Sequence, residues 1–135
     1  MEAVSSRSLN CLRIKDQIRE ILEHIVSPII LTTYEGHAWE RMAFQGARSA
    51  NPGIHCVGYA HAPLFEWQHG VRRPLGNRYD PDRIMTSGTI QKRHLENKNK
   101  FSDIPIQVLG SKRVNAAPND KPKEANNLRK HKDRR

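Results

Sequence analysis

Apolar residues recur at three- and four-residue spacing over residues 9–26, which predicts an amphipathic helix with one apolar face. Pro28 ends this helix, and the apolar, β-branched run 29–34 that follows is typical of a buried parallel strand. Apolar positions with helical spacing return over residues 37–50. The first fifty residues therefore predict a helix, a strand and a second helix.

The same alternation continues in shorter elements. The pattern predicts a second strand over residues 54–59, a third strand over 83–87, a third helix over 89–97 and a fourth strand over 104–109. Pro105 lacks the N–H of a ladder donor, so we expect the fourth strand to begin there or to lie at a sheet edge.

Short apolar strands that alternate with helices imply right-handed crossovers and a parallel sheet. We therefore expect an α/β protein: a partial doubly wound (Rossmann-like) parallel sheet of about four strands with flanking helices. These elements make about half of a doubly wound domain. The chain then enters a charged tail where further elements are expected, and we interpret it as truncated.

Charge divides the chain into two parts. Residues 112–135 hold nine Lys/Arg and three Asp/Glu, whereas residues 1–111 hold fourteen and eleven, so the tail carries most of the net charge of +9. We expect residues 1–111 to form the partial domain and residues 112–135 to be a disordered basic tail, and we expect residues 115–135 to lack core contacts. Such a tail supplies weak, salt-sensitive, non-specific affinity for polyanions.

Cysteine usage and hydropathy bear on the compartment. Cys11 and Cys56 lie 45 positions apart, which fits neither a disulfide framework nor metal spacing. The amino terminus does not resemble a signal peptide, and the longest apolar run, residues 25–31, is too short to span a bilayer. We expect a reduced, cytoplasmic protein without a transmembrane segment.

The densest chemistry follows the first predicted strand. Residues 33–41 hold two carboxylates, a histidine, an arginine and two aromatics, and open α/β sheets place ligands beyond the carboxyl ends of their strands. Glu35 stands beside a glycine and has no evident packing task. Glu40 suits either a site or the helix dipole, whereas Trp39 and Phe44 suit the core better than a ligand platform.

Five segments in order carry a resemblance to a known family: YEGHAWER (34–41), GYAH (58–61), QHGVRR (68–73), YDPDRIMTSG (79–88) and VLGSKR (108–113). The series resembles the middle of bacterial surface-carbohydrate (capsule or lipopolysaccharide) biosynthesis proteins of the glycosyltransferase type, with the two Rossmann-like domains of the GT-B architecture. The similarity covers about residues 12–113.

In that architecture the first domain receives the acceptor and the second holds the nucleotide sugar. Residues 79–88 resemble the end of the first domain, and residues 104–111 resemble the opening strand of the second. No glycine-rich diphosphate loop follows. The resemblance thus implies an acceptor-side half that is inactive alone. It binds nucleotide sugar and carbohydrate acceptor only in a complete enzyme, with a complementing second domain or chain.

Glycosyl transfer needs a base for the acceptor hydroxyl and a positive group for the leaving phosphate. A carboxylate or imidazole at a strand end suits the first task, and a guanidinium suits the second. The catalytic candidates are Glu35, His61 and His37. We expect them to gather with the arginine pair 72–73 at one edge of the sheet, because parallel strands deliver all their carboxyl ends to the same side. The substrate- or phosphate-binding candidates are Arg72, Arg73 and Tyr34. We rank Arg41 lower, because it could pair with a helix-face carboxylate.

Other function classes find less support. The sequence has no Walker-type loop, no Gly-x-Gly-x-x-Gly and no Gly-x-Ser-x-Gly. We expect no metal and no cofactor, although His37, His61 and His69 could converge in space. Two alternatives stay open: a small basic nucleic-acid or ribosome-associated binding protein, and a non-catalytic remnant with an open sheet edge.

Overall fold

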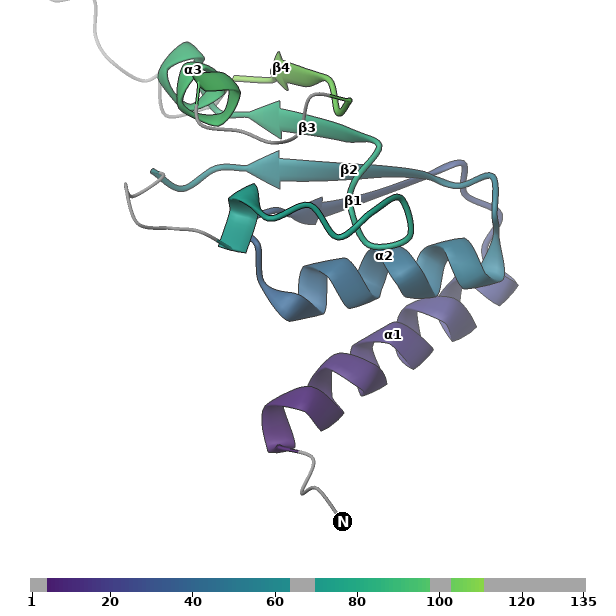
Figure 1. The fold of residues 1–135 in the computed structure, drawn as a ribbon. Coiled ribbons are helices and arrows are strands. Elements are labelled where there is room, and N and C mark those ends of the chain that lie inside the picture. The colour runs from purple at the N-terminus through teal and green to yellow at the C-terminus, as the bar shows by residue number, and fades with distance from the viewer. Residues whose placement is uncertain (1–4, 64–69, 98–102, 111–135) are drawn as a thin grey trace, which may run out of the picture.

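The computed structural model describes residues 5–63, 70–97 and 103–110 (Figure 1). Its strands form one parallel sheet in the order β1-β2-β3-β4: β1 (Ile29–Thr33), β2 (His55–Ala60), β3 (Arg83–Thr86) and β4 (Ile106–Val108). The helices are α1 (Ser6–His24), α2 (Ala38–Ala50) and α3 (Thr89–Asn97), with a short 3-10 turn, η1 (Gly70–Arg72). The predicted α/β fold with a parallel sheet and flanking helices is confirmed.

Each strand lies beside the next one along the chain, so the strand order does not reverse within the described residues. One half of a doubly wound sheet has this arrangement. The predicted tail, residues 112–135, and its expected disorder lie outside the described residues.

Helix α1 packs on α2, and α2 separates it from the sheet (Figure 1). The helix begins at Ser5, whose hydroxyl accepts a hydrogen bond from the Ser8 amide at 3.2 Å. A Cβ added at Gly46 of α2 would lie 2.3 Å from the carbonyl oxygen of Lys15. The two helices therefore cross at a point where only a glycine fits.

One hydrophobic cluster joins α2 and α3 to a single face of the sheet. Phe44 of α2 and Leu95 of α3 belong to it, together with Cys56 and Ile84 of the central strands. A parallel sheet whose strands follow in chain order places right-handed crossovers on one face, which explains why both helices share this cluster. On the other face of β1, Ile29 and Leu31 are 54% and 58% exposed.

The strands deliver their carboxyl ends to one edge of the sheet (Figure 1). Side chains tie this edge together: the Tyr59 hydroxyl donates to the Gly110 carbonyl at 3.0 Å, and Gln91 of α3 donates to the Ala62 carbonyl. None of the described helices is long and apolar enough to cross a membrane.

Replacing Gly46 with valine should destabilise the protein by about 1–3 kcal/mol, because the new side chain must displace the α1 backbone at Lys15. Thermal or urea unfolding measures this change. Gly53→Ala is the matched control, since its Cβ would meet only the Asn51 side chain at 3.5 Å. Equal stability of Gly46→Val and the parent would contradict the close helix crossing.

Stability should fall at alkaline pH. Burial raises the pKa of the Cys56 thiol from 9.0 to about 11, and burial also raises the pKa of Tyr34. The folded state then holds these protons more tightly than the unfolded state, so the stabilisation is complete below pH 9 and is lost as the pH rises towards 11. Urea unfolding across this range tests it, and Cys56→Ala should flatten the decline. A stability that rises with pH would contradict this account.

Candidate active site

The Glu35 carboxylate lies between two imidazoles at the carboxyl edge of the sheet. Glu35 Oε2 is 3.3 Å from His37 Nε2, and Glu35 Oε1 is 3.6 Å from His61 Nε2. The Glu35 side chain is 26% exposed, and the two imidazoles are about half exposed. Tyr59 stacks on His61, with ring centroids 6.0 Å apart. The edge of the sheet thus presents a partly exposed carboxylate in contact with two imidazoles.

The proximity of Glu35 and His61 follows from the topology. Glu35 comes two residues after the end of β1, and His61 comes directly after β2. These neighbouring parallel strands run in register, from Ile29 opposite His55 to Thr33 opposite Tyr59. The prediction that the catalytic candidates and the arginine pair 72–73 gather at one edge is therefore confirmed for Glu35, His37 and His61. For the arginine pair it stays a prediction, as does the catalytic role of all these residues.

Gly36 shapes the turn that carries this cluster. Its φ is +85°, a conformation that L side chains rarely adopt. A Cβ at this position would lie only 2.1 Å from the Val71 amide nitrogen. The backbone of η1 therefore rests directly on the turn after β1, and any side chain at Gly36 would force the two apart.

A second carboxylate, that of Glu40, holds the backbone of the same turn. Glu40 is fully buried and accepts hydrogen bonds from the amides of Glu35, Gly36 and His37, at 2.8–3.0 Å. The Thr33 hydroxyl donates to it as well, at 3.1 Å. Glu40 is therefore the acidic half of the capping box of α2, whose N-cap residue is His37. These bonds favour the structural interpretation of Glu40 over a site role.

Arg41 is buried in an ion pair with Asp80. Its guanidinium also donates to the carbonyls of Gly70 at 2.9 Å and Arg73 at 2.8 Å, and it lies 5.5 Å from the centre of the Tyr34 ring. The sequence suggests a carboxylate on a helix face as the partner of Arg41. The actual partner lies in the connection from β2 to β3, 39 residues along the chain.

Arg48 repeats the arrangement two turns along α2. It donates to Asp82 Oδ1 at 2.8 Å and to the Asp80 carbonyl at 2.9 Å. Asp82 Oδ2 in turn accepts from the Cys56 amide at 2.7 Å. The two aspartates of the YDPD segment therefore join α2 to the connection and to β2, so the segment has a structural task that the sequence did not reveal.

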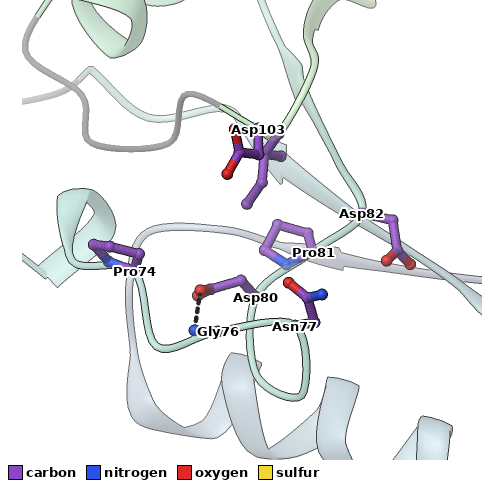
Figure 2. A pocket seen from close by; sticks show the side chains of 8 residues that line it. Pro74, Gly76, Asn77, Asp80, Pro81, Asp82 and Asp103 are labelled. Carbon is purple, nitrogen blue, oxygen red and sulfur yellow. Dashed lines mark hydrogen bonds between the residues drawn. The ribbon is translucent and has the colours of Figure 1, made fainter.

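A cavity of about 430 Å³ lies beside this connection (Figure 2). Its lining includes Asn77, Asp80, Asp82 and Asp103. Asp80 accepts from the Gly76 amide at 2.7 Å, the bond drawn in Figure 2. Asp82 and Asp103 come just before β3 and β4, so the cavity lies towards the amino ends of these strands, away from Glu35.

No known protein family, curated protein or solved structure matches the chain. The described residues also include no cluster of three or more His, Cys, Asp or Glu side chains arranged to hold a metal ion. His69 lies outside the described residues.

The three residues predicted to bind substrate or phosphate differ in their surroundings. Tyr34 is fully buried, its ring packs 6.3 Å from that of Phe44, and its side chain would meet any Cβ at Gly58 at 2.8 Å. Its position is that of a core residue rather than a ligand contact. Arg73 is exposed near the turn, and its carbonyl is used by Arg41. Arg72 ends η1, but its side chain lies outside the described part.

Two structural roles go beyond the sequence-based expectations: the capping-box role of Glu40, and the pairing of Arg41 with Asp80 and of Arg48 with Asp82. A usable signal existed for Glu40, because an acid three residues after a helix N-cap is the second half of a capping box. No local signal marks the arginine pairs, whose partners lie more than thirty residues away.

Replacing Asp80 with asparagine should destabilise the protein by about 3–5 kcal/mol, because the buried Arg41 charge loses its partner. The matched control is Glu96→Gln, which breaks the exposed ion pair with Lys92 at 3.6 Å and should cost less than about 1 kcal/mol. Urea unfolding compares the two. Similar small losses for both variants would show that the Arg41–Asp80 pair does not hold the connection.

Proposed function

We propose that the chain is the acceptor-side half of a glycosyltransferase from surface-polysaccharide biosynthesis, with the Glu35–His37–His61 cluster supplying the general base. The observation that carries the proposal is the Glu35 carboxylate held 3.3 Å and 3.6 Å from two imidazoles at the carboxyl edge of a parallel sheet. Ligands bind at this edge in open α/β sheets. The ordered motif series that resembles GT-B enzymes supplies the reaction class.

In this reaction the acceptor hydroxyl oxygen attacks the anomeric carbon of the nucleotide sugar. The bond between that carbon and the phosphate oxygen breaks, and the nucleotide leaves. Glu35 takes the hydroxyl proton, which His61 or His37 can pass to solvent, since both imidazoles are about half exposed. The exposed Arg73 lies in the segment seated on the Gly36 turn, which suits contact with a phosphate.

Three internal charges do not take part in this chemistry. Glu40, Arg41 and Asp80 are buried and bonded to the protein's own backbone or to each other. Among the carboxylates around the Gly36 turn, Glu35 is the partly exposed one. This separation of structural and reactive carboxylates supports Glu35 over Glu40 as the base.

In the proposed enzyme, a second domain or chain binds the nucleotide sugar. The two free cysteines, Cys11 and Cys56, suit the reducing conditions of the cytoplasm. The basic segment 112–135 adds weak, non-specific affinity for polyanions.

Replacing Glu35 with glutamine in the chain combined with the donor-binding domain or chain should slow glycosyl transfer by roughly 10²–10⁴-fold, with the fold retained. Steady-state turnover with a fixed acceptor measures the loss. Glu23→Gln, an exposed carboxylate on α1, is the control and should leave turnover unchanged. An undiminished rate for Glu35→Gln would remove Glu35 from the mechanism and transfer the base role to His61.

The 135-residue chain alone should neither transfer sugar nor bind a nucleotide sugar measurably. Isothermal titration calorimetry with a panel of nucleoside diphosphate sugars tests this expectation. Saturable binding by the isolated chain would contradict the assignment of the donor to a separate domain.

A further inference from the structure

We infer that Glu40 occupies, with its own carboxylate, the anion site at the first strand-to-helix turn, so that this turn excludes external anions and fixes the backbone that carries Glu35 and His37. The inference goes beyond the proposed function and does not depend on which reaction Glu35 serves. It assigns to Glu40 the place that a phosphate group takes in nucleotide-binding sheets of related topology.

Three backbone amides and one hydroxyl donate hydrogen bonds at this site. The amides of three consecutive residues, Glu35, Gly36 and His37, point at the Glu40 oxygens at 2.8–3.0 Å, and the Thr33 hydroxyl completes the set at 3.1 Å. Successive amides that converge in this way form an anion-binding concavity. The amino end of α2 adds its positive dipole.

The Glu40 carboxylate accepts a hydrogen bond from each of these four donors. The residue is fully buried and contributes both oxygens, with Oε2 alone accepting from all three amides. Glu40 also lies one residue before Arg41, whose pair with Asp80 fixes this turn of α2 from the other side. The carboxylate is therefore held in place by the helix that it caps.

Two consequences follow for ligands. A phosphate cannot use the amides of residues 35–37 while Glu40 is present, because its oxygens would meet a buried carboxylate. An incoming substrate instead finds the Glu35 side chain, which the same amides hold at the sheet edge. Glu40 is thus a positioning residue that acts through the backbone of residues 35–37.

The test removes the internal anion and offers an external one. Glu40→Ala deletes the atoms that acetate can restore, so sodium acetate and inorganic phosphate are the probes, with amide chemical shifts and hydrogen exchange of residues 35–37 as the readout. In the parent chain neither probe should move these amides. In Glu40→Ala their exchange should accelerate by roughly 10–100-fold, and acetate should reverse this saturably.

Asp80→Ala is the control for a merely structural loss: it also removes a buried carboxylate, yet acetate should not restore the amides of residues 35–37. Should Glu40→Ala fail to fold, Glu40→Gln replaces one acceptor with a donor and should accelerate exchange at the same amides. The inference is overturned if the parent binds either anion at these amides. It is also overturned if folded Glu40→Ala binds neither, or if Glu40→Gln leaves all three exchange rates unchanged.

Discussion

The buried pair of Arg41 and Asp80 is the interaction on which the rest of the structure depends. The connection from β2 to β3 contains no α-helix in its described part, so its backbone carbonyls cannot all be satisfied locally. Arg41 donates to two of them, at Gly70 and Arg73, while Asp80 neutralises its charge and accepts from the Leu75 and Gly76 amides. One cation from α2 thereby organises a crossover that usually needs a helix of its own.

This crossover gives the candidate site its shape. It seats η1 on Gly36, where no side chain fits, and so fixes the turn after β1. Glu40 fixes the same turn from within α2. The charges at this corner of the sheet therefore divide into two groups. Glu40, Arg41 and Asp80 are buried and hold the backbone, whereas Glu35 stays partly exposed against His37 and His61.

The sequence predicted every described helix and strand to within a few residues, because each has its own hydrophobic period. It also predicted that Glu35 and His61 meet, because parallel strands deliver their carboxyl ends to one edge. The burial of Tyr34 could not be predicted from the sequence, because it depends on the packing of the Tyr34 ring over Gly58 of the neighbouring strand. The pairing of Arg41 with Asp80 could not be predicted either, because Asp80 lies 39 residues further along the chain, in a loop without hydrophobic periodicity.

The central claim is that one carboxylate at the sheet edge contacts two imidazoles from different segments of the chain. Imidazole ¹H–¹⁵N spectra of the parent and of Glu35→Gln test it most directly. We predict that the resonances of His37 and His61 shift together. The resonances of His55, which begins β2 and lies beside Asp82, and of His94 on α3 should stay in place. A shift confined to His37, the sequence neighbour of Glu35, would contradict the shared site.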